Sequence, residues 1–514
     1  MSTPWEVLVP LPVVLPLLGA GLGLLLGRSA MLRVLSVLIL AADVAVAGAL
    51  LVRADGSGPV GVAAGGWSAP LGIALVADRL AALLLLTSSL VLLAVLVYAM
   101  AERSLTGGQE AVEPRVFHPG YLGLAAGVNL AFLSADLFNL FVAVELTLAA
   151  SYVLMTLGPT PPRVRAGMTY LVVSLTSSIL FVTAVAICYA ATGTLSLAQL
   201  GQRLPQLPEG LQTSLALLLF VVFGIKAAVV PLHMWLPDSY PTALAPITAV
   251  FAALLTKVAV YALVRTQTLI SPAGAPSRLV LGFALATLLV GLFGALVQRD
   301  LNRLLSLVLV GHIGYLLFGL GLDTAAGLRG AILYMLHHIV ALATLFMAAG
   351  MVRLAAGSAR LDKVRGLSHT APVIAVLFLV PALSVSGVPP FSGFVAKLAL
   401  VQAGVAAGRP EAYLLVGTGV FVSLLTLLAM SRVWMRMFWG EPGPAGDPPV
   451  PGLGRAGQSA PATLMAATTA GVLVAGLALA VLAGPLSEIA GRAAADLLDP
   501  TAYRAATLGT GVAP

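Results

Sequence analysis

Lysine is the residue type in this sequence best suited to carry a proton through an apolar interior. Only four of the 27 Lys and Arg residues are Lys, and three of them, Lys226, Lys257 and Lys397, lie inside long apolar runs. Arginine keeps its proton in a protein, whereas the pKa of a buried lysine can fall to about 5–6. We therefore interpret the three lysines as sites that release and rebind a proton. The alternative is that they reach the membrane interface or merely pair with a carboxylate.

Glu145 is the acidic counterpart of these lysines, near the middle of the apolar run DLFNLFVAVELTLAASYVLM. Burying a charge in a membrane helix costs about 2.5–3.5 kcal/mol, so four cost roughly 10–14 kcal/mol. That cost is comparable to the whole stability of a protein, about 5–15 kcal/mol, so these charges must pair or line a wet cavity. Asp136, Asp78 and Asp43 are less informative, because an aspartate at a helix start is equally explained as an N-cap.

Four histidines are candidates for supporting steps, because histidine changes its charge near neutral pH. They are His233, His312, His337 and His338. His233 follows Lys226 by about two helical turns and shares its face if the helix continues. His337 and His338 point about 100° apart on a helix, so at most one of them faces a given pathway. For each histidine, a packed and hydrogen-bonded side chain is an equally good interpretation.

No metal or organic cofactor is expected. Neighbouring histidines do not converge on one ion, and no Cys or carboxylate spacing supports a metal or haem site. The glycine motif GAGLGLLLG lacks the preceding strand of a dinucleotide-binding fold and fits close helix packing better. Cys188 is the only cysteine. We expect it to be a small buried side chain without an internal disulfide.

The elements that position these groups are membrane helices. Of the 514 residues, 60% are hydrophobic and only 9% are charged, against about 25% charged residues in soluble domains. A chain this apolar must face lipid. The net charge of +7 is spread thinly between apolar runs and forms no basic helix, so no nucleic-acid partner is expected.

Windows of about 20 apolar residues predict about fourteen transmembrane helices. The first run lacks the basic residues of a signal peptide, so we expect it to remain as a helix. The predicted spans are 7–27, 31–53, 77–101, 118–134, 136–158, 165–192, 211–232, 244–267, 278–299, 301–321, 327–354, 370–405, 411–439 and 461–488. Lys and Arg are more frequent in the loops of one side, which predicts both termini outside a bacterial cell membrane.

The loops are too short for a catalytic or nucleotide-binding domain, so the chain is not expected to be an enzyme. Residues 55–69, DGSGPVGVAAGGWSA, predict a turn or hairpin outside the membrane. Residues 441–459 are rich in Pro and Gly and predict a flexible loop.

Two predicted helices are interrupted by Pro and Gly. One break, PLHMWLPDSYPTALAP, follows Lys226, and the other, PALSVSGVPPFSGF, precedes Lys397. Broken helices in corresponding parts of two halves indicate a transporter with internal repeats and a site near the middle of the membrane. We therefore expect an N-terminal three-helix segment, two five-helix repeats, and a loop with the last helix. Their bounds are 1–117, 118–267, 268–440 and 441–514.

Three segments of this sequence resemble one known family. DLFNLFVAVELTLAASYVLM, PLHMWLPDSYPTALAPITAVFAALLTKVAVYALVR and PALSVSGVPPFSGFVAKLALVQAG are similar to the D subunits of multisubunit Mrp-type Na⁺/H⁺ antiporters. These subunits are related to the antiporter-like subunits of respiratory complex I. The resemblance covers nearly the whole chain. It implies fourteen helices, two inverted five-helix repeats, and broken seventh and twelfth helices.

The resemblance also implies roles for individual residues. Glu145 matches the fifth-helix glutamate that pairs with the seventh-helix lysine, here Lys226. Lys257 matches the eighth-helix relay lysine, and Lys397 matches the ionisable residue of the broken twelfth helix. The implied relay runs from Lys226 by way of Lys257 and the histidines to Lys397, with water in the gaps. In the whole complex, proton uptake drives Na⁺ efflux, so the expected partners are H⁺, Na⁺, lipid and other subunits.

Two other functional classes remain open. A proton-pumping subunit of an NADH:quinone oxidoreductase needs redox partners that this chain does not contain. The lysine at position 397 also disfavours one complex I paralogue, which has glutamate at the matching place. An ordinary single-chain carrier of an organic solute needs a substrate cavity with specific polar contacts and works alone.

Overall fold

The structure is a computed structural model of the chain, and it describes residues 4–26, 30–67, 72–106, 114–270, 277–441 and 459–509. Within these residues, 13 helices are long and apolar enough to cross a membrane. Two shorter apolar helices, Pro372–Ser386 and Ser392–Ala406, follow one another across a break in the region of the expected span 370–405. The predicted all-α membrane fold, with about fourteen spans expected from the sequence, is confirmed.

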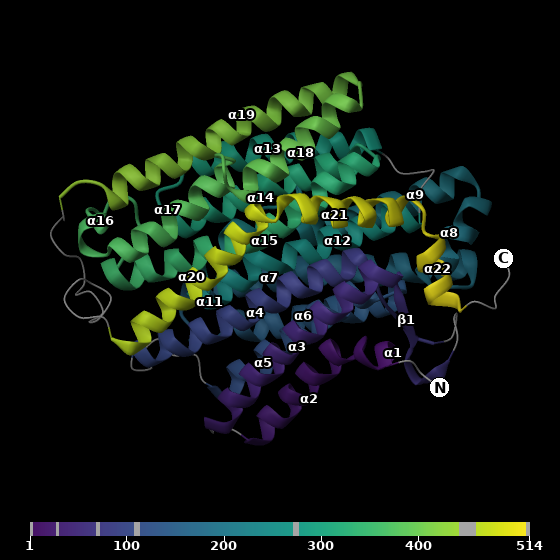
Figure 1. Cartoon of the computed structure of the whole chain (residues 1–514), viewed down its shortest axis with the longest axis horizontal. Helices are drawn as coiled ribbons and strands as arrows, with labels where there is room; N and C mark the ends of the chain where they lie inside the picture. Colours follow the sequence, from purple (N-terminus) through teal and green to yellow (C-terminus); the bar gives the residue numbers. More distant parts are fainter. Residues whose placement is uncertain are drawn as a thin grey trace.

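The N-terminal part of the chain begins at one edge of the bundle, shown in purple in Figure 1, and its helices continue toward the middle. They are α1 (Pro4–Leu8), α2 (Leu11–Leu26), α3 (Ala30–Ser57) and α4 (Arg79–Leu105). Between α3 and α4, strand β1 (Val60–Ala63) pairs antiparallel with β2 (Ala74–Ala77). β1 lies within the predicted segment 55–69, and β2 lies beyond it, so the hairpin extends past that segment. Its position outside the membrane stays a prediction.

The next helices carry Glu145, Lys226 and Lys257. They are α5 (Pro114–Leu133), α6 (Leu137–Met155), α7 (Pro161–Thr192), α8 (Leu197–Arg203), α9 (Glu209–Ala227), α10 (Trp235–Ser239), α11 (Ala245–Val250) and α12 (Thr256–Arg265). A π-helical turn at Phe251–Leu255 joins α11 to α12, and the whole segment Ala245–Ile270 forms one span.

The remaining helices carry the other histidines and Lys397. They are α13 (Ser277–Leu296), α14 (Leu301–Gly321), α15 (Ala325–Ala356), α16 (Leu367–Thr370), α17 (Pro372–Ser386), α18 (Ser392–Ala406), α19 (Pro410–Val433), α20 (Ala460–Val481), α21 (Ala483–Leu498) and α22 (Thr501–Leu508). In Figure 1, α19 lies at the edge opposite α1 and α2, and α20 and α21 run across the face turned to the viewer. The loop predicted at 441–459 falls almost entirely on residues 442–458, outside the described residues.

Burial is greatest in the middle of the bundle. α14 and the span Ala245–Ile270 are buried along nearly their whole length, whereas α20 is exposed along most of its length. α15 packs against α14, α17, α18, α20 and α21. Lys257 and His312 therefore lie on the two most deeply buried spans.

Both predicted helix breaks are present. α9 ends at Ala227, and Ala228 then takes a left-handed conformation with φ 58°. α17 ends at Ser386, and Gly387 takes the same kind of conformation with φ 86°. A left-handed residue after the last helical one caps the helix and turns the chain away from its axis.

The first break corrects one expectation. The helix of Lys226 does not continue to His233, because it ends at Ala227 and Pro231 has no N–H for a further helical bond. His233 therefore does not share a helical face with Lys226. The capping interpretation of Asp136 is confirmed, since its carboxylate accepts a hydrogen bond of 2.6 Å from the backbone N–H of Asn139 at the start of α6.

Candidate functional site

Glu145 and Lys226 are joined through a serine. Ser178 of α7 donates a hydrogen bond from its hydroxyl to Oε1 of Glu145 on α6, and Lys226 Nζ on α9 donates to Ser178 Oγ at 3.3 Å. The two charged groups also attract one another electrostatically. Lys226 lies in the last turn of α9, where the negative end of the helix dipole favours a positive charge.

A cavity of about 50 Å³ lies beside Lys226. Its polar wall consists of Thr147, Tyr170 and Ser174. On another side the cavity reaches Leu255 and Val258, on either side of Lys257 in the sequence. A cavity large enough for a water molecule and lined by several hydroxyl groups is the kind of site that holds ordered water in proteins. The cavity therefore places a site suited to water between Lys226 and the helix of Lys257.

Lys257 is completely buried, and its Nζ donates a hydrogen bond of 2.6 Å to the carbonyl of Ala252. Ala252 belongs to the π-helical turn Phe251–Leu255 directly before Lys257. Single π-helical turns of this kind are frequent at functional sites. Among the described residues, no carboxylate forms an ion pair with Lys257.

Three histidines form a buried cluster between α14 and α15. The ring centroids of His312 and His338 are 5.6 Å apart, and Tyr334 stacks on His338 at 5.6 Å. His312 Nε2 lies 3.0 Å from Thr426 Oγ1, and His337 Nδ1 lies 2.9 Å from Ser392 Oγ. His337 and His338 thus face different neighbours, as adjacent helix positions require.

This cluster leaves several ring nitrogens without a hydrogen-bond partner in the described part of the chain. They are His312 Nδ1, His337 Nε2, and both ring nitrogens of His338. An unpaired buried polar atom costs about 1–3 kcal/mol. These atoms are the expected positions for water molecules or for a proton in transit.

Lys397 of α18 is held at the second break. Its Nζ donates to the carbonyls of Val385 and Ser386 at 2.9 and 3.3 Å, and it lies 4.8 Å from the ring centroid of Tyr315. The last carbonyls of a helix have no intrahelical partner and carry the negative end of its dipole. The break of α17 therefore supplies oxygen atoms that stabilise the ammonium group without a carboxylate.

Electrostatic interactions connect the cluster to both lysines. His312 and His338 each interact with the charges of Lys257 and Lys397. The structure thus brings together seven of the eight predicted site residues in two groups, with the cavity between them. His233 is the exception: it is buried and hydrogen-bonds the backbone at Pro231, but within the described residues its ring makes no hydrogen bond to a relay residue.

The comparisons with known proteins agree on one family. Residues 134–426 match the family model described as NADH:quinone oxidoreductase/Mrp antiporter, transmembrane. Over 438 residues the chain is 39% identical to the D subunit of the Na⁺/H⁺ antiporter of Alkalihalophilus pseudofirmus, a match that covers 84% of this chain and 87% of that protein. The chain belongs to the NADH:quinone oxidoreductase/Mrp antiporter family.

Two solved structures share the fold of this Mrp antiporter family member. A chain of the Mrp complex from Dietzia sp. superposes with a TM-score of 0.90 at 32% identity, covering 99% of this chain and 100% of that chain. A chain of respiratory complex I from Thermus thermophilus superposes with a TM-score of 0.79 at 24% identity, covering 96% and 99%. At that identity the second likeness shows the fold alone.

No group of three or more His, Cys, Asp or Glu side chains in the described residues of this family member is arranged to hold a metal ion. The site therefore consists of protonatable side chains, hydroxyl groups and backbone carbonyls. Sequence analysis overlooked Ser178, because serines occur at many positions in these helices and only the packing of α6, α7 and α9 distinguishes this one.

A second set of charged residues, with a buried ion pair at its inner end, was also overlooked by sequence analysis as a set. Arg265 at the end of α12 is 1% exposed, and its Nη2 pairs with Asp78 Oδ1 at 2.5 Å. Its Nε donates to the hydroxyl of Tyr261 at 2.9 Å, and its guanidinium lies 5.0 Å from the ring centroids of Tyr261 and Tyr503. Arg265 is thus saturated by an ion pair, a hydrogen bond and two aromatic rings.

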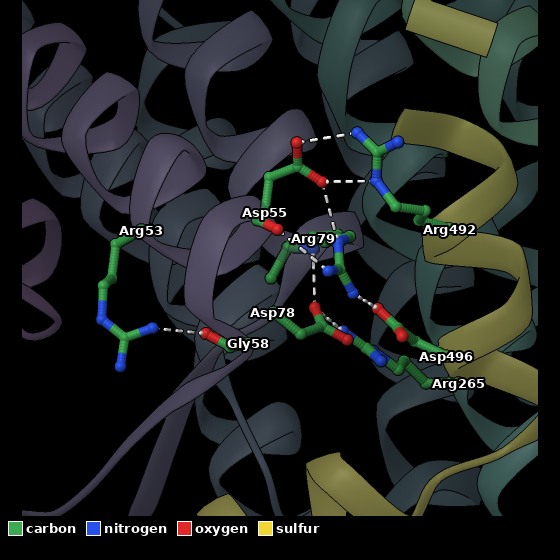
Figure 2. A network of polar contacts seen from close by, with 9 residues as sticks. Arg53, Asp55, Gly58, Asp78, Arg79, Arg265, Arg492 and Asp496 are labelled. Atoms are coloured by element: carbon green, nitrogen blue, oxygen red, sulfur yellow. Dashed lines mark hydrogen bonds and ion pairs between the residues drawn. The ribbon is translucent and has the colours of Figure 1, made fainter. Parts of the chain in front are cut away.

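More ion pairs extend this set to helix α21, as Figure 2 shows. Asp55 of α3 lies between Arg79 of α4 and Arg492 of α21, at 2.9 and 2.8 Å. Arg79 also pairs with Asp496 of α21 at 2.6 Å. We refer to Asp55, Asp78, Arg79, Arg265, Arg492 and Asp496 as the arginine cluster. It ties α3, α4, α12 and α21 together.

Proposed function

We propose that this protein is the D-type subunit of a multisubunit Na⁺/H⁺ antiporter and that it carries protons along its buried and half-buried Glu, Lys and His side chains. Membership of the family makes the chain a membrane subunit of a transporter rather than an enzyme. In this proposal the complex resides in a bacterial plasma membrane with both termini of this chain outside. Proton uptake through the complex drives Na⁺ efflux.

One observation carries the proposal: the buried lysines and histidines form a row whose members are incompletely bonded. Buried charges in membrane helices are costly and mark ion pathways and proton relays. Among the described residues, Lys257 and Lys397 have only backbone carbonyls as hydrogen-bond acceptors. A lysine held by neutral groups can lose its proton without leaving an opposite charge unpaired.

The relay begins at the bridged pair. While Glu145 is ionised, its charge favours the protonated form of Lys226. When Glu145 is neutralised, Lys226 releases its proton toward the cavity, where water carries it to Lys257. His338, His312 and His337 then provide steps to Lys397 at the second break. His233 retains only the role of a supporting group near the first break.

The proposal also includes a division of the chain into four segments. We propose two inverted five-helix repeats at 118–267 and 268–440, between the segments 1–117 and 441–514. Their support is that each contains one broken helix with a left-handed residue at the break and at least one buried lysine. The alternative function, a proton-pumping subunit of an NADH:quinone oxidoreductase, is supported by the shared fold and by the family model, which covers both kinds of protein.

The proposal is tested by Na⁺-dependent proton exchange in everted membrane vesicles that contain the complete antiporter complex. Lys226→Ala and Lys397→Ala are compared with Lys363→Ala, which removes the exposed fourth lysine. We expect exchange to be lost in the first two variants and unchanged in the third, with all three complexes assembled on a native gel. Exchange that survives both buried substitutions contradicts the proposal.

A further inference from the structure

We propose that Ser178 is the bridging residue through which the protonation of Glu145 controls that of Lys226. The inference rests on the proposed function, because it assigns a control step to the first lysine of the relay. Ser178 Oγ makes three contacts: it donates to Glu145 Oε1, it lies 3.0 Å from the carbonyl of Ser174, and it accepts from Lys226 Nζ at 3.3 Å.

The hydroxyl group of Ser178 can donate to only one of its two acceptors at a time. A serine hydroxyl has one proton to donate and two lone pairs that accept. Glu145 Oε1 and the carbonyl of Ser174 therefore compete for the same proton, while Lys226 donates to a lone pair. Rotation about the Cβ–Oγ bond switches the hydroxyl between its two acceptors.

The charge of Glu145 decides between the two orientations. An ionised carboxylate is the stronger acceptor and directs the hydroxyl proton to itself. The Ser178 oxygen then presents its lone pairs to Lys226 and stabilises the ammonium group. When Glu145 is protonated, the backbone carbonyl of Ser174 becomes the better acceptor, and the hydroxyl turns away from the carboxyl group. Lys226 keeps Ser178 Oγ as an acceptor but loses the attraction of the ionised carboxylate, so its ammonium group is less stabilised.

The same bridge provides a proton route between the two groups. After Lys226 has released its proton toward the cavity, the O–H bond of protonated Glu145 breaks as an O–H bond forms at Ser178 Oγ, and the original O–H bond of Ser178 breaks as an N–H bond forms at Lys226 Nζ. The result is a protonated lysine, an ionised carboxylate and an unchanged serine. No other reactant is needed, and the pair of opposite charges is restored.

The neighbouring serine supplies a matched control. Ser177 is also completely buried on α7, but its hydroxyl donates to the backbone carbonyl of Val222 on α9 at 3.0 Å. Removing the Ser177 hydroxyl therefore disturbs the same helix contact without touching Glu145 or Lys226. The two serines separate a packing effect from an effect on the charged pair.

Few other titratable groups near Ser178 complicate a pH measurement. The helices packed against α7 present Glu145 and Tyr152 from α6, Lys226 and Glu209 from α9, Asp238 from α10 and the buried Tyr240 from the 3-10 helix Tyr240–Thr242. Asp238 is exposed and pairs with Arg303 at 2.8 Å. On α7 itself, Tyr170 interacts with the charge of Glu145 and shares a 2.7 Å hydrogen bond with Ser151. A Tyr170→Phe variant identifies any contribution from that phenol group.

The test measures Na⁺-dependent exchange against pH for Ser178→Ala, Ser178→Thr and Ser177→Ala in the assembled complex. Ser178→Ala is expected to lower the maximal rate about tenfold, the effect of one lost charge-assisted hydrogen bond. It should also narrow the active pH range from both ends, because both charged groups lose a partner. Ser178→Thr keeps the hydroxyl and should restore rate and range, and Ser177→Ala should match the unmodified protein.

The outcomes distinguish this inference from the proposed function. If Ser178→Ala keeps the original rate and pH range while Lys226→Ala and Glu145→Ala abolish exchange, the relay stands and the bridge is wrong. A Thr variant that fails to restore the pH range, beside a normal Ser177→Ala, also overturns the bridge. If Lys226→Ala and Glu145→Ala both keep full exchange, the proposed function itself fails.

Discussion

The protein contains two sets of charged residues that differ in how completely they are bonded. In the arginine cluster, arginines pair with aspartates, and Arg265 also contacts two tyrosine rings. Along the relay, lysines and histidines contact hydroxyl groups and carbonyls, and several ring nitrogens in the described residues have no partner. The charges of the arginine cluster are paired with opposite charges, whereas the relay lysines and histidines have few or no charged partners.

The residue types explain the difference. Arginine is always charged and its planar group binds several partners at once, so it suits a permanent link between helices. Lysine and histidine can lose a proton, but full ion pairing would hold that proton in place. A buried charge in this protein therefore has a structural role where it is saturated and, by our proposal, a transport role where it is not.

The largest expected effect comes from breaking the saturated set. Asp78→Ala leaves Arg265 charged and unpaired in the interior, which costs about 3–5 kcal/mol. We expect a large loss of thermal stability in detergent and little assembled complex. Asp362→Ala is the matched control, because the Arg360–Asp362 pair is exposed and its loss should change neither property. A stable Asp78→Ala protein would show that the arginine cluster does not have the structural role that distinguishes it from the relay residues.

A smaller loss of stability is expected when the positive charge at position 265 is kept and the planar guanidinium group is replaced. Arg265→Lys retains the ion pair with Asp78 but loses the hydrogen bond to Tyr261 and the flat face against Tyr503. The lost contacts are worth about 1–2 kcal/mol. Thermal unfolding should show a decrease below that of Asp78→Ala, with normal exchange per assembled complex. A loss of exchange in this variant would place Arg265 among the transport residues.

The smallest effect on stability is expected in the open set. Lys257→Met removes a fully buried ammonium group whose hydrogen bond is to a single carbonyl. The saved cost of burying a charge offsets the lost hydrogen bond, so stability should stay within about 1 kcal/mol. Exchange, in contrast, should disappear, whereas Lys363→Met should keep it. A Lys257→Met protein that unfolds readily but transports normally would show that Lys257 has a structural role and no transport role.

The sequence predicts the fold well because the signals for it are local. Apolar runs define the spans, and Pro and Gly near Lys226 and Lys397 define the two breaks. Asp136 shows the limit of such reasoning, since its capping role and a transport role were equally good interpretations until the bond to Asn139 was seen. His233 shows another limit, because its predicted alignment with Lys226 assumed a continuous helix.

The contacts that give the site its properties are not local, and the sequence does not reveal them. Ser178 gains its role only because three helices meet at its hydroxyl. In the sequence, Arg265 looks like an ordinary arginine at a helix end. Its contacts with Asp78 and Tyr503, which are distant in the sequence, form only in the folded protein. The π-helical turn before Lys257 has no distinct residue pattern either. In each case the decisive partner is supplied by tertiary packing.

The central claim is that the relay lysines must release their protons, and Lys226→Arg tests it most directly. The variant keeps the positive charge beside Glu145, and the cavity next to Lys226 has room for the larger group, but arginine stays protonated in a protein. The measurement is Na⁺-dependent proton exchange per assembled complex in everted vesicles. We predict normal assembly with exchange abolished. Exchange close to that of the unmodified protein would show that Lys226 supplies only a fixed charge, and would contradict the relay.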